Sequence, residues 1–405
     1  MRTPAQQQRA RAPQRALAAL LFAGCAALAG AAPYVPASDA TVLERVPARS
    51  ELERLAPLRA AVAARPADLE AALALATGYV GIGRRESDPR FIAYAESALL
   101  PWLAQPSPPE RALVLQATAL QYLHQFDAAL ALLDRALSRE PLDGQAWLTR
   151  ASLLELRGDY AAAHRACARL VRSADEFTAL TCLASVAGRS GQLAASYAAL
   201  RASGGPDPRL PAPLRAWRLS VLAEMAERLG DDRAAEAHLE EARRAAGDDP
   251  YVKASYADLL LRTGRPREVL ALLAGNESQD PLLLRLAIAA KRLGTGAQAD
   301  HLAQLYEERL RAAERDRDYT HQREQALYLL DVRDDPRGAV EVARRDWATQ
   351  REPADVRVYA RAAAQARAAD DEAALARWLA QSHYEDRTLG TPLDPGAQGA
   401  AQERR

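Results

Sequence analysis

The sequence predicts an all-α protein, a superhelical solenoid of about eight to nine antiparallel helix pairs, some of them degenerate. Two copies of one residue pattern lie about 34 residues apart between Arg111 and Ser173. Within each copy the apolar residues recur at every third or fourth position, which is the spacing of one helix face. Only 5% of the residues are aromatic, and alanine is abundant, which favours close helix packing over strands.

The repeated pattern has small residues where two helices must cross and large residues beside the crossing. Ala151 and Ala163 are the small residues, Trp147 and Tyr160 fill the adjacent space, and Gly158 separates the two helices. A single hairpin of this kind cannot bury its apolar face alone, so each pair must stack on its neighbours. The recurring positions of the second copy are Trp147, Ala151, Leu154, Gly158, Tyr160, Ala163, Cys167 and Asp175. The same offsets in the first copy hold Leu113, Ala117, Leu120, His124, Phe126, Ala129, Leu133 and Pro141.

These positions resemble the tetratricopeptide repeat family. Its pattern has a Trp, a Leu, a Gly or Ala and a Tyr, followed after the turn by an Ala, an aromatic residue, an Ala and a Pro. The resemblance is good over residues 110–175 and thinner on both sides. It implies a solenoid whose first helices line a concave groove, and a role in binding a protein or peptide.

Breaks in the helical pattern divide the chain into two arrays. We expect an N-terminal array over residues 51–203 and a C-terminal array over 214–381, separated by a linker at 204–213 that holds two Gly and four Pro. From Leu389 the chain is rich in Gly, Pro, Gln and Ala, and we predict a disordered tail over residues 382–405. In the first repeat we expect Gly81 and Gly83 to end one helix and Pro101 to end its partner.

The N-terminus predicts export. Residues 1–31 combine an arginine-rich leader with an apolar run from Ala16 to Leu28, as in a bacterial signal peptide. Cleavage before Ala32 would release a soluble periplasmic protein. Alternatively, the residues before Cys25 resemble a lipobox, which would make Cys25 a lipidation site and attach the protein to a membrane, with residues 32–50 as a tether. An uncleaved anchor is a third alternative. The expected location is the periplasm or the periplasmic face of the outer membrane.

Two cysteines remain beyond the leader, and stacking places Cys167 and Cys182 on facing helices. An oxidising compartment would allow a disulfide between them. The alternative is a pair of buried thiols, which behave as small apolar groups.

No arrangement of residues predicts catalysis, a cofactor or a metal. The sequence has no phosphate-binding loop with Gly, Lys and Ser or Thr, and its six His residues are scattered. The cysteines lack metal-site spacing. The 53 basic and 53 acidic residues give a formal net charge of zero, which argues against a nucleic-acid partner.

The concave groove is therefore the candidate binding site. Arg189, Arg228, Arg262 and Arg292 each lie two residues before a turn glycine, so stacking would align them as a basic ladder that could hold a peptide carboxylate. The alternative is that each cation only complements the dipole at the end of its helix. The other predicted groove residues are Gln121, Tyr122, Ser152, Glu155, Ser185, Glu224 and Asp258.

These observations predict a non-enzymatic scaffold of the bacterial cell envelope that binds a protein or peptide. Two alternatives stay open. One is a structural assembly factor that self-associates. The other is an envelope hydrolase or transferase that uses scattered acidic residues.

Overall fold

The computed structural model describes residues 50–86, 88–204, 209–247, 249–316 and 321–389. The chain divides into two compact units, Met1–Glu53 and Arg54–Arg405, and the helix pairs belong to the second unit. The predicted signal peptide, the lipidation candidate Cys25 and nearly all of the predicted tether lie outside the described residues.

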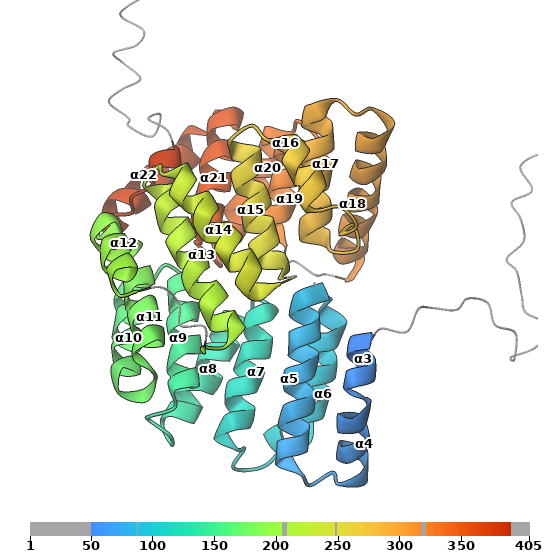
Figure 1. Ribbon diagram of the computed structural model, residues 1–405, viewed down its shortest axis with the longest axis vertical. Coiled ribbons are helices and arrows are strands. Elements are labelled where there is room, and N and C mark those ends of the chain that lie inside the picture. Colours follow the sequence, from blue (N-terminus) through green and yellow to red (C-terminus); the bar gives the residue numbers. More distant parts are fainter. Residues whose placement is uncertain (1–49, 87, 205–208, 248, 317–320, 390–405) are drawn as a thin grey trace, which may run out of the picture. The chain divides into compact units, whose positions relative to one another are not determined.

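Helices account for the regular structure of the described residues, which contain no strand (Figure 1). After α3 (Ser50–Arg54) and α4 (Ala56–Ala64), the chain forms consecutive antiparallel helix pairs, numbered here 1 to 9. The pairs are α5 (Leu69–Glu86) with α6 (Pro89–Leu103), α7 (Glu110–Tyr122) with α8 (Phe126–Leu137), α9 (Gly144–Leu156) with α10 (Tyr160–Ser173), α11 (Glu176–Gly188) with α12 (Leu193–Ala202), α13 (Ala212–Arg228) with α14 (Asp232–Ala246), α15 (Pro250–Arg262) with α16 (Pro266–Leu272), α17 (Asp280–Leu293) with α18 (Ala297–Asp316), α19 (Gln322–Asp331) with α20 (Pro336–Trp347), and α21 (Pro353–Ala366) with α22 (Ala369–Ser382). A short 3-10 helix, η2 (Arg387–Leu389), comes after α22. The predicted all-α solenoid of helix pairs is confirmed.

The turn between the two helices of a pair requires a left-handed backbone, and the repeat register places a suitable residue there. Gly158 has φ 77°, and His124, its counterpart one repeat earlier, has φ 55°. Glycine adopts this conformation without strain, whereas other residues rarely adopt it. The agreement at His124 shows that the offset read from the sequence is the structural repeat.

The small residues of the pattern lie at helix crossings, as expected. Ala151 and Ala163 are both completely buried, and Tyr160 is 6% exposed beside them. Aspartates begin the helices of this region: Asp143 and Asp159 accept hydrogen bonds from the backbone N–H groups of Ala146 and Ala162. Such caps are worth about 1 kcal/mol each.

The first pair departs from the expected boundaries. Helix α5 continues through Gly81 and Gly83 to Glu86, and α6 continues through Pro101 to Leu103. A Cβ added at Gly83 would lie 3.0 Å from the Cδ1 atom of Ile92, on the partner helix. Gly83 therefore allows α6 to approach α5 closely, and the prediction that glycine ends this helix was wrong.

The predicted linker at 204–213 does not interrupt the stacking of helices. Helices α12 and α13 pack against each other on either side of it. The guanidinium of Arg218, in α13, donates to the carbonyl oxygens of Leu200 at 2.7 Å and Gly204 at 2.9 Å, and it lies 4.6 Å from the Phe177 ring centroid. Residues 205–208 lie outside the described part of the chain, and both predicted arrays belong to one compact unit.

Pairs far apart in the sequence also meet. The side chain of Gln279, before pair 7, donates to the carbonyl of Arg85 in pair 1 at 2.8 Å. The backbone N–H of Arg351, before pair 9, donates to the carbonyl of Leu156 in pair 3 at 2.6 Å. Both contacts join parts of the chain that are six pairs apart: pair 1 with the segment before pair 7, and pair 3 with the segment before pair 9. The solenoid therefore contacts its own next turn.

The segment after α22 takes part in the same packing. Tyr384 is 7% exposed, its ring lies 4.4 Å from the Arg228 guanidinium, and Arg387 donates to the carbonyl of Leu229 at 3.2 Å. The predicted disorder of residues 382–405 was therefore wrong for 382–389, because Tyr384 and its neighbours supply buried contacts that composition does not reveal. Residues 390–405 lie outside the described range.

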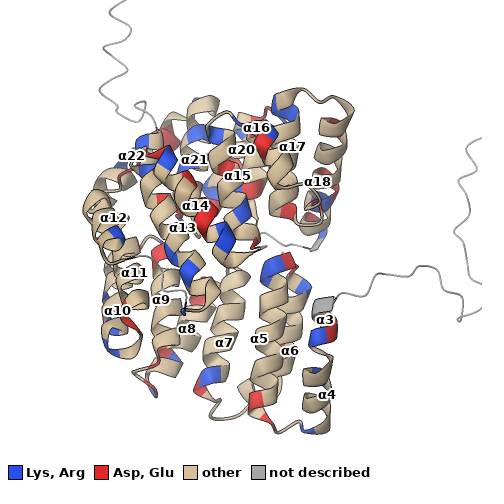
Figure 2. Ribbon diagram, in the orientation of Figure 1, with Lys and Arg blue, Asp and Glu red and all other residues tan. Residues whose placement is uncertain are grey.

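Charges of both signs are interspersed along α13 to α20, whereas those of α5 and α7 lie near the helix ends (Figure 2). Within the described residues, no helix is both long and apolar enough to cross a membrane.

Candidate partner-binding surfaces

The predicted arginine ladder occupies the ends of the first helices. Arg189 is the residue that caps the C-terminus of α11, Arg228 and Arg262 end α13 and α15, and Arg292 lies in the last turn of α17. These are the positions at which a cation complements the helix dipole. The structure therefore contains the geometry required by both alternatives, and the partners of each guanidinium distinguish them.

The first two arginines of the ladder, Arg189 and Arg228, are enclosed by partners from this chain. Arg189 is 7% exposed and forms ion pairs with Glu155 at 3.2 Å and Glu224 at 2.6 Å. Arg228 is fully buried and donates to the carbonyl oxygens of Gly188 at 2.6 Å and Glu385 at 3.0 Å. Their guanidinium groups join successive pairs to one another and to the C-terminal segment, so they are not exposed to a ligand.

The last two arginines of the ladder, Arg262 and Arg292, are more accessible to solvent but also have partners. Arg262 forms ion pairs with Glu227 at 3.0 Å and Asp232 at 2.6 Å. Arg292 donates to the carbonyl of Leu261 at 2.6 Å, at the end of the preceding first helix. Acids and carbonyl oxygens of adjacent pairs are thus the partners of the ladder arginines, which link successive repeats to one another.

Burial and pairing act in opposite directions on the acids of this network. Burial raises the pKa of Glu155, although Arg189 and a 2.6 Å hydrogen bond from Ser185 favour its ionised form. Burial also opposes ionisation of Glu224, but Arg189 and Arg228 outweigh it and hold the pKa of Glu224 below its usual value. A charge that is enclosed and paired in this way fixes geometry more than it adds stability.

The remaining predicted groove residues divide into paired and half-buried groups. The Tyr122 hydroxyl donates to the carbonyl of Gly83 at 2.9 Å, and Asp258 forms an ion pair with Arg285 at 2.7 Å. Gln121 and Ser152 are half-buried on the first helices of their pairs. The surface has a pocket between α8 and α10 and another that is lined by Gly158 and Arg351. None of the predicted groove residues lines either pocket.

A second buried charge cluster was not predicted. Arg285 is 3% exposed and contacts Glu324 at 3.4 Å, while Arg323 pairs with Glu352 at 2.7 Å and Asp355 at 3.1 Å. Arg285 lies in the middle of α17, whereas the other four residues lie at or just before the starts of α19 and α21. Charges at helix starts are therefore a signal for those four and not for Arg285.

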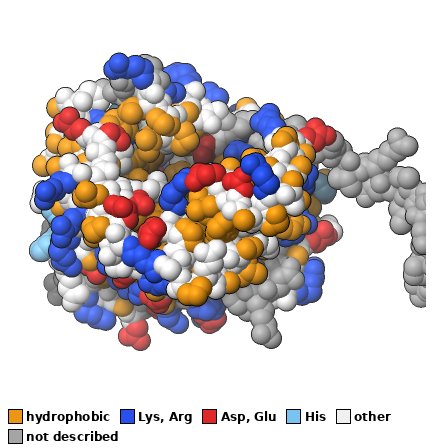
Figure 3. Space-filling view, turned by 90° about the horizontal axis from the view of Figure 1, so that it is seen from below, with side chains coloured by type: hydrophobic (Ala, Val, Ile, Leu, Met, Phe, Trp, Pro, Cys, Tyr) orange, Lys and Arg blue, Asp and Glu red, His pale blue; other side chains and the backbone are white. Residues whose placement is uncertain are grey.

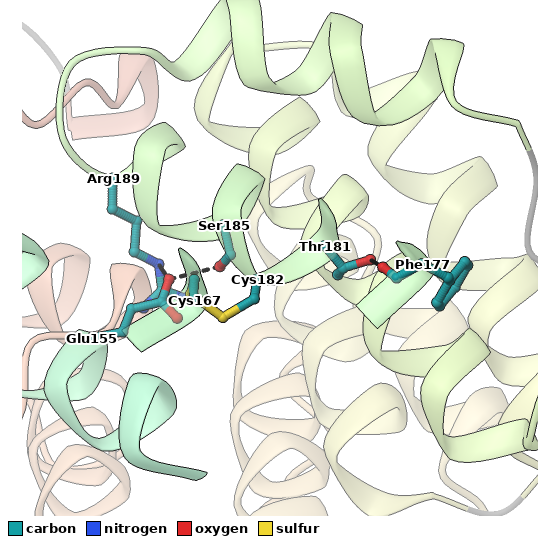
Figure 4. The surroundings of a disulfide bond; sticks show 7 residues. All are labelled: Glu155, Cys167, Phe177, Thr181, Cys182, Ser185 and Arg189. Carbon is teal, nitrogen blue, oxygen red and sulfur yellow. Dashed lines mark hydrogen bonds and ion pairs between the residues drawn. A yellow bond between two sulfur atoms is a disulfide. The ribbon is translucent and has the colours of Figure 1, made fainter. Parts of the chain in front are cut away.

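Cys167 and Cys182 form a disulfide that joins α10 to α11 (Figure 4). Of the two alternatives, the structure contains the disulfide. On the same helix as Cys182, Ser185 and Arg189 contact Glu155 from α9, so a covalent bond and a polar cluster hold the same three helices together.

A groove on the second helices is the other candidate surface. It lies between α8 and α10, has a volume of about 410 Å³, and has Trp147 and Arg150 of α9 among its lining residues. The exposed side chains Arg165 and Arg169 of α10 also line it. We call it the α8–α10 groove. The sequence did not predict it, because the family resemblance implies a groove lined by the first helices; the signal in the sequence is that α10 contains no acidic residue.

Figure 3 shows one face, on which hydrophobic patches are interrupted by both basic and acidic side chains. Among the described residues, no group of three or more His, Cys, Asp or Glu side chains is placed to hold a metal ion.

No family model and no curated protein matches the chain. Among solved structures, it is similar to the human IFIT1 dimer with PPP-AAAA at 12% identity and a TM-score of 0.46, covering 77% of this chain and 71% of that chain. It is similar to the TPR domain of P58(IPK) at 16% identity and a TM-score of 0.25, covering 84% and 100%. The yeast Tom70 structure gives 10% identity and a TM-score of 0.32, covering 88% and 93%. The stacked helix pairs and the repeat of about 34 residues make the described part of the chain an all-α solenoid of helix pairs.

Proposed function

We propose that this protein is a non-enzymatic scaffold of the bacterial cell envelope that binds a polypeptide partner. The observation that supports it most directly is the series of consecutive helix pairs from α5–α6 to α21–α22, which exposes long helix faces on a framework fixed by ion pairs. Solenoids of this type present extended surfaces for binding. The zero net charge favours a polypeptide over a nucleic acid as the partner.

Two features support the envelope location. The N-terminal sequence has the charge and apolar pattern of a signal peptide. The disulfide between Cys167 and Cys182 suits an oxidising compartment, where such bonds form and persist. Both a soluble periplasmic protein and a lipoprotein attached through Cys25 are consistent with these features.

Fractionation of a Gram-negative host that expresses the full chain tests the location. We expect the product in the periplasm or with the outer membrane, shortened by its leader, and oxidised at both internal cysteines by mass spectrometry under non-reducing conditions. A full-length product in the cytosol would contradict the proposal. A fatty-acylated N-terminal Cys25 would select the lipoprotein form.

Photo-cross-linking in the same cells tests partner binding. A photoreactive amino acid is placed at exposed positions on three separated helices: His164 on α10, Arg243 on α14 and Glu308 on α18. We expect a discrete heterologous adduct from at least one position. Adducts of twice the protomer mass alone would support the self-associating assembly factor, and no adduct at any position would overturn the scaffold proposal.

A further inference from the structure

Helix α10 carries an exposed basic stripe that the rest of the molecule does not neutralise. Arg165, Arg169 and Arg172 are spaced by four and three residues, so they lie on one face, and all three are exposed. Within the described part of the chain none of them forms an ion pair, whereas the ladder arginines on the first helices are all paired. The helix itself contains no acid. Its positive charge is therefore free to attract an anionic partner.

The stripe borders a groove with an aromatic wall. Trp147 lines the α8–α10 groove, and its indole N–H donates to the carbonyl of Pro141 at 2.9 Å, which fixes the ring. The guanidinium carbons of Arg150 and Arg169 lie 6.0 Å and 5.8 Å from the ring centroid. An aromatic ring with cations beside it can accept an apolar side chain while guanidinium groups hold neighbouring carboxylates.

A large apolar side chain is exposed close by in the sequence. Leu142, which follows the Pro141 whose carbonyl accepts the Trp147 N–H, is 62% exposed. An exposed apolar side chain near a charged groove is typical of a surface that binds a polypeptide.

The basic face is narrow, which limits the kind of anion it suits. Asp134, on the opposite wall of the groove, pairs with Arg150 at 2.9 Å, and Asp175 and Glu176 are exposed just beyond the end of α10. These acids would repel the closely spaced phosphates of a nucleic acid or an anionic membrane. A short segment whose carboxylates alternate with apolar side chains avoids that repulsion.

We propose that the α8–α10 groove is the docking site for an acidic polypeptide segment. An aromatic or aliphatic side chain of the segment packs against Trp147, and its carboxylates form charge-assisted hydrogen bonds with Arg165, Arg169 and Arg172. The disulfide at Cys167 ties this helix to α11 and so keeps the arginines at fixed positions. This inference rests on the proposed function and specifies the partner class and the surface.

Fluorescence anisotropy with the oxidised full chain tests the site. The probe is a labelled twelve-residue peptide that contains six Glu and two Phe; a second peptide with Ala in place of Phe tests the apolar contribution. The groove variant is Arg165→Glu with Arg169→Glu. The control is Arg243→Glu with Arg244→Glu on α14, both exposed, which changes the net charge equally elsewhere.

We expect the groove variant to weaken binding of the Phe peptide at least about tenfold, because two charge-assisted contacts become repulsive. The control variant should change affinity by less than about twofold at physiological salt, where distant charges are screened. The Ala peptide should bind several-fold more weakly than the Phe peptide. Circular dichroism melts of both variants establish that they fold.

Three results would overturn the proposal. The first is no binding of the Phe peptide at low salt. The second is an equal loss of affinity in both variants, which would mean that only net charge matters. The third is tighter, groove-dependent binding of oligouridylate or of phosphatidylglycerol vesicles, which would assign the surface to nucleic acid or membrane. Cross-linking in cells separates the two proposals: a partner captured equally by wild type and groove variant would refute the groove but leave the scaffold.

Discussion

Pairs 3 and 4 (α9–α12) and pairs 8 and 9 (α19–α22) use the same helix-pair geometry but hold it with different chemistry. In the first region small residues such as Ala151 and Ala163 are fully buried at the crossing, and a disulfide joins α10 to α11. In the second, Trp347 and Trp378 meet edge to face with centroids 4.8 Å apart. The side chains of Asp346, which precedes Trp347, and of Asp355 are buried in the same region.

This difference shows that a repeat fold constrains shape more than composition. The covalent bond of the first region makes its stability depend on the redox state, and the acid enclosed there, Glu155, is paired with Arg189 at 3.2 Å. The second region encloses two neighbouring carboxyl groups, so its stability should depend on pH. The two regions also contact each other, through Tyr160 and Trp378 at 6.4 Å between ring centroids and through Arg351 at Leu156.

At pH 5, the largest effect is expected from removing the disulfide. The variant Cys167→Ala with Cys182→Ala should lose about 3 kcal/mol in the free energy of unfolding, the chain-entropy value for a 15-residue separation. Urea unfolding with and without reductant measures it. Reductant should lower the midpoint of the wild type to that of the variant and leave the variant unchanged. A wild-type midpoint that does not respond to reductant would show that the covalent bond does not brace this region.

The second effect is a pH dependence that originates in pairs 8 and 9. Burial, and then the negative charge of Asp355, raises the pKa of Asp346 from its ordinary value to about 9, although Arg323 opposes the shift. Gln350 donates to Asp346 at 3.1 Å, and Glu324 adds further negative charge. The folded protein therefore keeps a proton on Asp346 that the unfolded chain releases once the pH exceeds about 4.

The sign of the pH effect is set by that proton. Because the unfolded state binds fewer protons, stability is greatest below the unfolded pKa and decreases as pH rises toward 9, by at most about 1.4 kcal/mol per pH unit for one group. Asp346→Asn mimics the protonated acid, so it should flatten this slope between pH 5 and 8 and make the variant the more stable protein at pH 8. Urea unfolding at four pH values measures both slopes. Parallel slopes would refute a protonated Asp346.

The region that resembles the repeat pattern was predictable because its rules are local. The turn register at His124 and Gly158 and the small residues at helix crossings follow from fixed offsets within about 34 residues. The pairing of Cys167 and Cys182 could be given only as one of two alternatives, because the distance between two helices is not written in the spacing.

The features that the sequence did not show depend on contacts between distant pairs. The ladder arginines lie at the predicted helix ends, but their partners, such as Glu385 for Arg228, come from up to 157 positions away. Tyr384 lies in the predicted tail and is buried between Trp378 of its own pair and Arg228 of α13, which is distant in the sequence. Gly83 was read as a helix end because an isolated glycine in a sequence does not reveal which neighbour packs on it.

The smallest effect tests the contact between the two regions directly. Gly191 and Gly264 have similar left-handed backbones, with φ of 87° and 77°. A Cβ added at Gly191 would lie 2.9 Å from the Cβ of His383, whereas one added at Gly264 would meet nothing within 4 Å. Both alanine variants should lose about 1–2 kcal/mol from backbone strain. Gly191→Ala should lose about 1 kcal/mol more, because it also overpacks against the C-terminal segment.

A second substitution isolates that extra loss. His383 has φ 53°, which glycine adopts readily, so His383→Gly should remove the obstructing Cβ without straining the backbone. Combined with Gly191→Ala it should recover about 1 kcal/mol, and combined with Gly264→Ala it should recover nothing. Urea unfolding of the wild type and the five variants, arranged as two double-mutant cycles, measures both couplings. Equal losses for the two alanine variants, or no coupling to His383, would mean that the C-terminal segment does not press on the fourth pair. The comparison between the two regions would then concern two separate parts of one solenoid, because nothing at this position would join them.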